Sequence, residues 1–385
     1  MSYHVFTLIW GDEFARDYLD TVAPTLRLSG NVPALACHGP VTFHIYTDRK
    51  TKGRFGAEFK VALGDHAHVQ MHDFSQITVG DQKLPGHVRG LESPALKYEI
   101  QHHCLKSLIS DLIDEPGAVL VLLDSNFVLA NGAFEGMLQR LKAGKKAVMV
   151  DVLRLDKSGA TEIVRDLVGN NMFSPCDAID NLMAHLHPIT RSFFVDAEAF
   201  SPYPSQVCWQ AGHTSFLARS FIPHPLAIAV SPGMTTLQST MDYDLALRAW
   251  PDDDIDLITD SDDVLVMKLS GAEHQADRPI GGRPTPKDLA LFALTSTHSR
   301  HRHFAEKPIR FHGAEMSDWQ KAEHAADRLI GDAYDLVERI IANAGHLDAS
   351  MLAYIKSYAG PIETFLSPQL DAQQLAPIRA GTAAA

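Results

Sequence analysis

The chain has 385 residues, of which 45% are hydrophobic, 21% charged and 8% aromatic. This composition is typical of a globular protein, and the length suits one large domain with an appended piece, because single cores stop growing near roughly 250–300 residues. The 47 acidic and 34 basic residues give a formal net charge of −13. A field of that sign repels polyanions, so we do not expect nucleic acid as a partner.

Neither a membrane segment nor an export signal is evident in the sequence. Apolar runs stay well below the roughly 18 residues that span a bilayer. The start, MSYHVFTLIWGDEF, lacks the basic region and the small-residue cleavage site of a signal peptide. Cys37, Cys104, Cys176 and Cys208 form no CxxC pair. We therefore expect a cytoplasmic protein with unpaired thiols.

Strand-like and helix-like segments alternate along residues 1–155. The apolar segment YHVFTLIWG predicts a strand, and DEFARDYLDTVAPTLRLSG follows with apolar residues at helical spacing and a terminal glycine. The pattern continues with the strands VTFHIYTD, HAHVQMHDF, AVLVLLDSN and AVMVDVLRL and with the helices SPALKYEIQHHCLKSLISDLIDEPG and GAFEGMLQRLKAGKK. Such alternation predicts a mostly parallel sheet with helices on both faces.

The second half of the chain is less regular. Residues 156–280 are rich in turns and predict a mixed sheet with long functional loops. DIDLIT and VLVMKLS are expected to form a strand pair around DSDD, and TPKDLALFALTSTHSRHRHF is expected to be helical. From residue 316 onward, apolar residues recur at the period of a helix up to a tail, APIRAGTAAA, without core-forming residues. We therefore predict an α/β domain over residues 1–315 and a C-terminal helical region with a flexible tail over residues 316–385.

A polar triplet follows the buried fourth strand. Asp124, Ser125 and Asn126 come directly after the apolar run AVLVLL. Ligands of parallel α/β sheets gather beyond the carboxyl ends of the strands. Oxygens at positions 124 and 126 could therefore bind one divalent cation, which in turn could hold a diphosphate. A turn capped by the Asp and Asn side chains is the alternative.

These segments resemble the GT-A fold glycosyltransferases, in particular the glycogenin and galactosyltransferase-like branch. VLVLLDSNFVLANGAFEGMLQRLKAGKKAVMVD is similar to the block that carries the family's DxD motif. VTFHIYTDRKT, LKYEIQHHCLKSLISD, CWQAGHTSFLARS and HRHFAEKPIRFHG resemble further family elements in the expected order. The resemblance covers residues 3–312 in layout. It implies a GT-A-like, Rossmann-type sheet and a nucleotide-sugar donor.

The same resemblance implies roles for individual residues. Asp124 matches the first DxD aspartate, and Asn126 stands where the second, metal-binding aspartate is usual. An amide oxygen is a weaker ligand for Mn²⁺ or Mg²⁺ than a carboxylate, so this departure weakens the implied metal site. His301 or His303 could complete that site, and Lys307 would neutralise the departing diphosphate. The matched segments add Asp48, Lys97, Ser125 and Gly212 as nucleotide-sugar contacts.

A general base is expected in STMDYDLALRAW, which is similar to the EDxDLxLR segment of other GT-A enzymes. Asp242 takes the position of the base in an inverting displacement. It could equally be an acidic residue favoured at a helix N-terminus. The galactosyltransferase-like resemblance implies retention instead, so the stereochemistry stays open. The literal DxD in TDSDDVLV lies late in the chain and is interpreted as a turn.

Three other polar features were considered as sites. HSRHRHF could form a cationic spot that holds phosphate, or an exposed helix end. His102 and His103 are adjacent and cannot share one helical face, which argues against a metal site made by that pair. His187 and Arg191 lie in a predicted loop and are candidates for acceptor contacts.

The function predicted from the sequence is transfer of a sugar from a nucleotide-sugar to a glycan or glycoconjugate, in bacterial surface polysaccharide assembly. Two alternatives remain. One is a catalytically silent GT-A-like binding or scaffold protein, and the other is a Rossmann-like methyltransferase. The segment WGDEFARD argues against the methyltransferase, because no glycine-rich loop follows the first strand. The sequence leaves the donor sugar, the acceptor and the oligomeric state undetermined.

Overall fold

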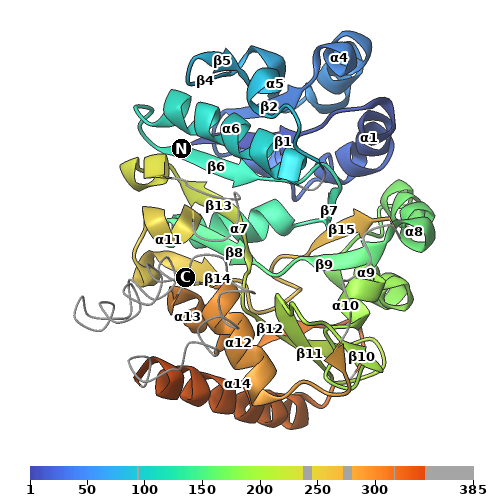
Figure 1. Ribbon diagram of the computed structural model, residues 1–385. Helices are drawn as coiled ribbons and strands as arrows, with labels where there is room; N and C mark the ends of the chain where they lie inside the picture. The colour runs from blue at the N-terminus through green and yellow to red at the C-terminus, as the bar shows by residue number, and fades with distance from the viewer. Residues whose placement is uncertain (93–94, 237–244, 272–279, 298, 316, 343–385) are drawn as a thin grey trace, which may run out of the picture. The chain divides into compact units, whose positions relative to one another are not determined.

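The computed structural model describes residues 1–342 except 93–94, 237–244, 272–279, 298 and 316 (Figure 1). The chain folds into two compact units. Unit 1 contains residues 1–187 and 223–273, and unit 2 contains residues 188–222 together with the residues from 274 onward. The predicted boundary between residues 315 and 316 stays a prediction.

Unit 1 is built on a seven-stranded sheet with the order β14-β8-β13-β6-β1-β2-β3. Its strands are β1 (Ser2–Leu8), β2 (Val41–Thr47), β3 (His68–Asp73), β6 (Ala118–Leu122), β8 (Ala147–Val150), β13 (His224–Ala229) and β14 (Ile255–Leu257). Only β13 runs antiparallel to its neighbours, and the other paired strands are parallel. The predicted α/β class, with a mixed and mostly parallel sheet flanked by helices, is confirmed.

Helices connect the strands of unit 1. They are α1 (Asp12–Asp17), the π-helix η1 (Tyr18–Val22), α2 (Ala23–Leu26), α3 (Val32–Ala36), α4 (Arg49–Leu63), α5 (Leu84–His87), α6 (Ala95–Leu112), α7 (Ala133–Lys142), α8 (Lys157–Gly169), α9 (Pro175–Leu182) and α11 (Leu245–Ala249). Short 3-10 turns are η2 (Phe74–Gln76), η3 (Met183–His185), η4 (Pro232–Thr236) and η5 (Asp252–Asp254). Of these helices, α6 packs against β1, α4 against β3 and α7 against β8.

A second, three-stranded sheet in unit 1 has the order β7-β15-β9. Its strands are β7 (Phe127–Leu129), β15 (Val266–Ser270) and β9 (Leu153–Asp156), and a small hairpin elsewhere in the unit joins β4 (Thr78–Val79) to β5 (Gln82–Lys83). Strand β15 runs antiparallel to β7 and parallel to β9. This sheet places the central strand β15 directly beside the segment that follows β6.

Two strand predictions were wrong. AVMVDVLRL forms two strands, because β8 pairs with β14 and β13 in the large sheet, whereas β9, which begins two residues after β8, pairs with β15 in the small sheet. DIDLIT and VLVMKLS do not pair with each other, since β14 pairs with β8 whereas β15 pairs with β7 and β9. The Asp-rich segment between them is the predicted turn, in which the Asp262 amide donates to Asp260 Oδ1 at 2.9 Å.

Unit 2 combines antiparallel strands with helices. Its elements are α10 (Pro188–Arg191), β10 (Ala199–Phe200), β11 (Gln206–Gln210), β12 (Phe216–Ser220), β16 (Ile280–Gly281), α12 (Pro286–Ser296), η6 (Ser299–His301), α13 (Arg302–Ala305), β17 (Ile309–Phe311) and α14 (Trp319–Ala342). The strands form the sheets β11-β12-β17 and β10-β16. Apolar residues of α12 and α14 share one core with β11 and β12. Helix α14 therefore packs on strands that precede it by about a hundred residues.

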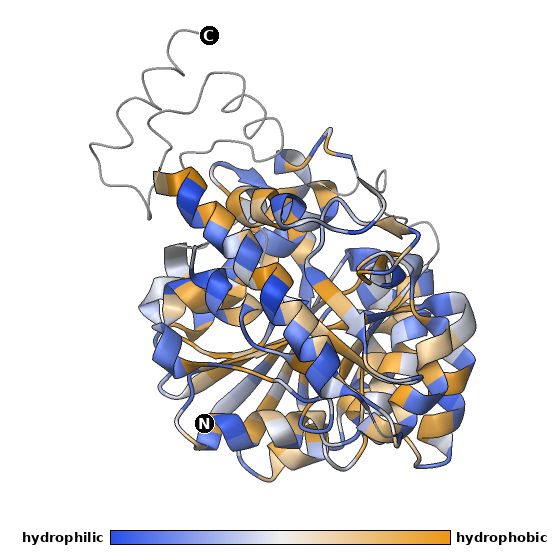
Figure 2. Cartoon of the chain, turned by 90° about the horizontal axis from the view of Figure 1, so that it is seen from below, coloured by the Kyte–Doolittle hydropathy of each residue, from blue (hydrophilic) through white to orange (hydrophobic). Residues whose placement is uncertain are grey.

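The core follows from burial of apolar strands and of one stripe on each helix. All five residues of β6 are buried, as expected for a parallel strand covered on both faces. Burial of each such side chain contributes about 1.5–3 kcal/mol. Figure 2 shows hydrophobic residues along the strands and an alternation of hydrophilic and hydrophobic residues on most helices.

Among the described helices, none is both long and apolar enough to cross a membrane. The four cysteines, all described, form no disulfide, as predicted.

Three histidines form a hydrogen-bonded row across strands β1, β2 and β3. His4 Nδ1 lies 3.1 Å from His44 Nε2, and His44 Nδ1 lies 3.1 Å from His72 Nε2. His44, the central member, is 5% exposed. Burial, together with the neighbouring His72, His4 and His68, lowers the pKa of His44 from 6.5 to about 3. His44 is thus neutral in the folded protein over the whole physiological range.

We expect this row to steepen acid unfolding. Between pH 6.5 and about 3 the unfolded chain binds a proton at His44 that the folded chain does not. The free energy of unfolding therefore falls as the pH drops through this window, by at most about 1.4 kcal/mol per pH unit from this group. Denaturant titrations of the wild type and of His44→Gln at several pH values measure the slope. The variant should lose stability less steeply, and parallel profiles would contradict the assignment.

Candidate functional site

The candidate site lies at the carboxyl edge of the large sheet. Strands β2, β1 and β6 are parallel neighbours, so their carboxyl ends meet at one edge. The amide of Leu123 donates to the Phe6 carbonyl at 3.1 Å, which extends the ladder by one residue beyond β6. Asp124 then opens a tight turn in which its carbonyl accepts from the Phe127 amide at 3.1 Å. The buried strand thus holds Asp124 in a fixed position at the edge where ligands of such sheets bind.

Asp124 forms a largely buried ion pair with Lys268. The Lys268 ammonium lies 2.5 Å from Asp124 Oδ2, and the two side chains are 19% and 12% exposed. Gln101 Nε2 donates to the other carboxylate oxygen at 3.3 Å. Burial alone would raise the pKa of Asp124, but the charges of Lys268 and then Lys97 outweigh it and hold the pKa far below its usual value. Asp124 is therefore a carboxylate at every physiological pH.

Lys268 reaches Asp124 from the centre of the small sheet. Residue 268 pairs with Phe127 in the β15–β7 register, and its ammonium lies 5.5 Å from the centre of the Phe127 ring. Its neighbours on β15, Met267 and Leu269, are buried. Lys268 was not among the predicted site residues, although a single lysine inside the apolar strand VLVMKLS is a usable signal. A charged group at such a position is expected to have a partner.

Helix α6 provides the other polar groups around Asp124. Gln101 is buried, whereas Lys97, one helical turn earlier, is exposed. Residues four apart lie on the same face of a helix, so both groups face the carboxylate. Lys97, predicted as a nucleotide-sugar contact, is thus on the same side of α6 as the residue that binds Asp124. Gln101 had not been predicted.

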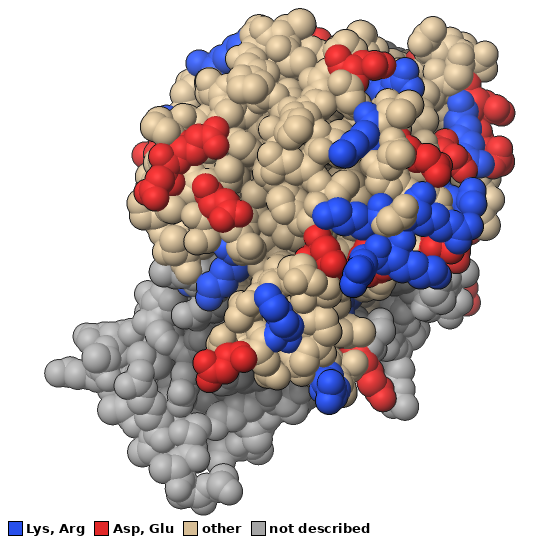
Figure 3. Space-filling view, turned by 90° about the horizontal axis from the view of Figure 1, so that it is seen from above, with Lys and Arg blue, Asp and Glu red and all other residues tan. Residues whose placement is uncertain are grey.

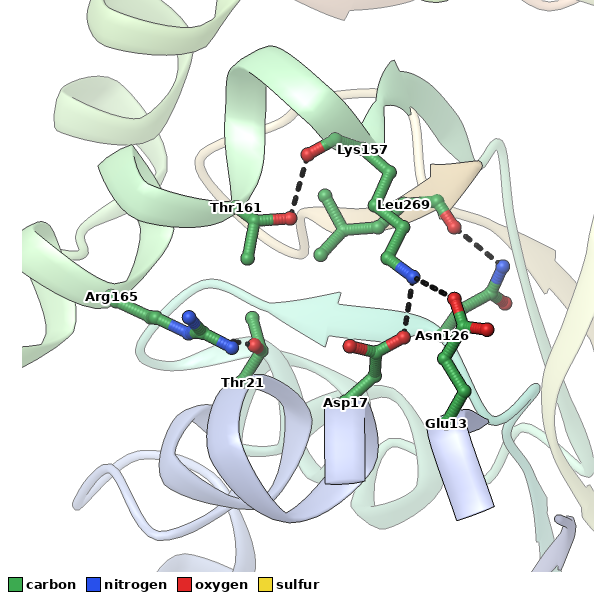
Figure 4. Close-up of polar contacts among 8 residues, drawn as sticks. All are labelled: Glu13, Asp17, Thr21, Asn126, Lys157, Thr161, Arg165 and Leu269. Carbon is green, nitrogen blue, oxygen red and sulfur yellow. Dashed lines mark hydrogen bonds and ion pairs between the residues drawn. The ribbon is translucent and has the colours of Figure 1, made fainter. Parts of the chain in front are cut away.

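Asn126 joins the turn to the small sheet (Figure 4). Its side-chain Nδ2 donates to the Leu269 carbonyl at 2.6 Å, and the Leu269 amide donates to the Asn126 carbonyl at 3.0 Å. An ionised aspartate has no proton to donate and would face the Leu269 carbonyl with a negative charge. The amide at position 126 is therefore explained by a structural hydrogen bond.

Within unit 1, the groups around Asp124 do not fit a divalent cation. The carboxylate that would be the strongest ligand is already paired with the Lys268 ammonium, and Gln101 donates to its second oxygen. Asn126 directs its amide nitrogen to a backbone carbonyl. Hard cations such as Mg²⁺ and Mn²⁺ need several oxygen ligands directed at one point. Here a lysine ammonium stands next to the carboxylate instead.

Asp48 and Ser125 complete the predicted residues of this edge. Asp48 follows β2 and caps α4: its Oδ1 accepts from the Thr51 amide at 2.9 Å and its Oδ2 from the Thr51 hydroxyl at 2.6 Å. Burial opposes ionisation of Asp48, but these hydrogen bonds lower its pKa overall. Ser125 is half-buried in the turn. A nucleotide contact by either residue stays a prediction.

Ion pairs hold α8 against α1, the helix that follows β1. Lys157, the first residue of α8, lies 2.5 Å from Asp17 Oδ2 and 3.4 Å from Glu13 Oε1 (Figure 4). Burial would lower the pKa of Lys157, but the Asp17 and Glu13 carboxylates raise it overall. Arg165 on the same helix donates to the Thr21 hydroxyl at 3.0 Å. These contacts join α8 to α1 and to η1, the two helical segments that follow β1.

Charges of both signs also mix on the outer surface. Figure 3 shows Lys and Arg next to Asp and Glu over part of the face seen from above. Within unit 1, for example, Asp12 pairs with Arg54 and, at 3.8 Å, with Lys50. Exposed pairs of this kind contribute about 0–1 kcal/mol each. They therefore add little to either the stability or the candidate site.

The remaining predicted residues lie in unit 2 or outside the described residues. Asp242 lies outside them. Gly212 is in the β11–β12 turn, where a side chain would collide with Ser215 and Glu315. His301 is buried at the end of η6, and His303 is half-buried on α13. The Lys307 amide donates to the Phe304 carbonyl at 3.0 Å. Their ligand contacts stay predictions.

The two candidates for acceptor contacts have different environments. His187 is fully buried, and its Nε2 lies 3.1 Å from the Gly271 carbonyl oxygen. Arg191 is exposed at the end of α10. His187 thus has a structural hydrogen bond inside unit 1, and Arg191 is accessible to solvent.

Known structures resemble this chain only weakly. No protein-family model matches the sequence, and no curated protein matches it. Mouse xyloside xylosyltransferase 1 is 12% identical over 39% of this chain and 53% of its own, with a TM-score of 0.28. The mannosyltransferase Ktr4p from S. cerevisiae is 12% identical over 46% of this chain and 48% of its own, with a TM-score of 0.26. TarS from S. aureus is 8% identical over 99% of this chain and 48% of its own, with a TM-score of 0.27. The chain spans about half the length of each of these three proteins.

Proposed function

We propose that this chain is a glycosyltransferase that binds a nucleotide-sugar through Asp124, Lys268 and Lys97. The observation that carries the proposal is the buried Asp124–Lys268 pair at the carboxyl edge of a mostly parallel sheet. Charged groups are rarely buried without a structural or functional reason, and this pair lies where such sheets bind ligands. The acceptor is proposed to be a glycan or glycoconjugate, in bacterial surface polysaccharide assembly.

The chemistry of the site suits a nucleoside diphosphate. Ionised Asp124 can accept hydrogen bonds from ribose hydroxyls. The ammonium groups of Lys97 and Lys268 can stabilise the negative charge that develops on a departing diphosphate, which is the main electrostatic task in sugar transfer. Because two lysines provide this charge, we propose that donor binding requires no divalent cation.

The residues outside this cluster take the roles that the family resemblance implies. Lys307 would add a further cation at the diphosphate, and Gly212 would let the backbone approach the sugar. Asp242 would accept the proton of the acceptor hydroxyl if the reaction inverts the anomeric centre. His301 and His303 would contact the diphosphate in place of binding a metal.

Nucleotide-linked stabilisation tests the proposal. UDP, GDP and CMP, and the corresponding sugar nucleotides, are added to the full chain in EDTA and in Mn²⁺, and the melting temperature is recorded. A ligand at about 100 times its Kd should stabilise the fold by about 2.7 kcal/mol. We expect at least one nucleotide to raise the melting temperature in EDTA. If none does so in either condition, the proposed function is wrong.

Two variants locate the binding site. Asp124→Asn should abolish the nucleotide-linked shift, whereas Asp65→Asn, an exposed carboxylate in the same unit, should leave it intact. Lys97→Met removes an exposed charge at little cost in stability. This variant should weaken binding of the nucleoside diphosphate about tenfold, because one charge-assisted hydrogen bond is lost. Binding of the nucleoside without phosphates should be unchanged. Equal weakening of both ligands would contradict the role of Lys97.

An assay of sugar hydrolysis and transfer, and a methyl donor added to the melting experiment, distinguish the alternatives. A silent scaffold would bind a sugar nucleotide but would neither hydrolyse nor transfer the sugar. A methyltransferase would be stabilised by a methyl donor and not by nucleotides. Between the end of β1 at Leu8 and the start of α1 at Asp12 stand Ile9, Trp10 and Gly11, so this connection has a single glycine and no glycine-rich loop for a dinucleotide-type site.

A further inference from the structure

Helices α5 and α6 bring two imidazoles and a carboxylate to one point in unit 1. His103 Nε2 lies 3.0 Å from Glu99 Oε1, and His87 Nε2 lies 3.2 Å from the same oxygen. The three donor atoms all lie within 4.8 Å of one another. We infer that His87, Glu99 and His103 form a binding site for a transition metal of the zinc class, separate from the donor site.

The spacing of the donor atoms fits the proposed ion. In a tetrahedral site with bonds of about 2.0–2.1 Å, neighbouring ligand atoms lie about 3.3 Å apart. The two nitrogen–oxygen separations, 3.0 and 3.2 Å, are close to this value. An ion can therefore replace the protons that join the two imidazoles to the carboxylate.

The donor set also indicates which ion is preferred. Two imidazole nitrogens and one carboxylate oxygen suit Zn²⁺, Co²⁺ or Ni²⁺, whereas Mg²⁺ and Ca²⁺ prefer oxygen ligands only. Three protein ligands leave a fourth position for water. The side chains of His87 and Glu99 are 34% and 38% exposed, so an ion can enter from solvent.

The helix geometry explains how this site was missed. Glu99 and His103 are four residues apart and share one face of α6, while His87 comes from the end of the preceding helix (Figure 1). The proposed ligands combine His103 with Glu99 and His87, and His102 is not among them. Lys97 and Gln101 lie two residues from Glu99 and His103, about 200° around the helix, and so face the other side. A bound ion would thus join α5 to the helix that carries the groups around Asp124.

Metal titration of the full chain tests the inference. After dialysis against EDTA and removal of the chelator, we expect calorimetry to show one equivalent of Zn²⁺, and Co²⁺ to give the visible absorption of a tetrahedral site. Mg²⁺ should not compete. His87→Ala and His103→Ala should each weaken Zn²⁺ binding by about 100-fold or more, since even outer-shell partners contribute about 10–100-fold.

Two controls separate this site from its neighbours and from the donor site. His102→Ala should bind Zn²⁺ like the wild type, because His102 is not one of the three residues whose donor atoms meet at the site. Asp124→Asn should also keep Zn²⁺ binding, even if it loses nucleotide binding. Absence of Zn²⁺ binding, or binding that survives both His87→Ala and His103→Ala, would overturn the inference. Neither result bears on the proposed function, which is tested separately by the nucleotide experiments.

Discussion

Replacement of Lys268 by methionine is expected to lower the free energy of unfolding by about 3–5 kcal/mol, the cost of leaving a buried charge without its partner. Lys268 and Asp124 are both largely buried, and Lys268 donates directly to the carboxylate. Methionine keeps the length of the side chain but cannot pair with Asp124. Urea denaturation measures the change. Lys60→Met, an exposed lysine on α4, is the control and should change stability by less than about 0.5 kcal/mol.

Removal of both charges distinguishes pairing from packing. In the double variant Lys268→Met with Asp124→Leu, neither charge of the pair is left buried, so much of the lost stability should return.

The stability of the single variant Lys268→Met should also depend on pH differently from that of the wild type. Without Lys268, the pKa of Asp124 should rise, because burial raises it and only the weaker influence of Lys97 still opposes this effect. If the pKa rises above that of the unfolded chain, the deficit should shrink as the pH falls through it. A deficit that is the same at pH 4 and pH 8 would argue against an uncompensated carboxylate.

Replacement of Arg219 by alanine is expected to destabilise unit 2 by about 3–4 kcal/mol, through lost packing and a lost hydrogen bond. The Arg219 side chain is 2% exposed on β12. Its guanidinium donates to the Glu306 carbonyl and to Asp327 on α14. It thereby joins the central strand of the β11-β12-β17 sheet to the segment after α13 and to α14. Thermal denaturation measures the loss, and proteolysis of α14 should accelerate in parallel.

Two further variants separate the contributions of Arg219. Asp327→Asn removes the charge of the exposed partner but keeps an oxygen that can accept from the Arg219 guanidinium, so its cost should be smaller than that of Arg219→Ala. Arg219→Met retains most of the buried volume of the side chain but removes the guanidinium charge. The Nε atom of that guanidinium has no hydrogen-bond partner among the described residues. Its cost should be well below that of alanine. If methionine is as costly as alanine, the charge itself, and not the packing, holds α14 in place.

Local patterns were sufficient to predict much of unit 1. The apolar run AVLVL gives β6, and the alternation of such runs with helical periodicity predicts a mostly parallel sheet. The aspartates of the turn at 260–263 also follow local rules. Where prediction failed, the decision was not local. AVMVDVLRL is one apolar run, yet its two halves join different sheets, because pairing partners distant in the chain decide where a strand ends.

The sequence by itself determined the fold class of unit 1 and the placement of Asp124 at the end of a buried strand, because burial and periodicity are properties of contiguous residues. Only the tertiary structure decided what Asp124 contacts. Lys268 is 144 residues away, and Asn126 bonds to a carbonyl 143 residues away. Likewise, the site of His87, Glu99 and His103 arises only when two helices pack together. The charge beside a carboxylate depends on which strands become neighbours, and that depends on the packing of the whole unit.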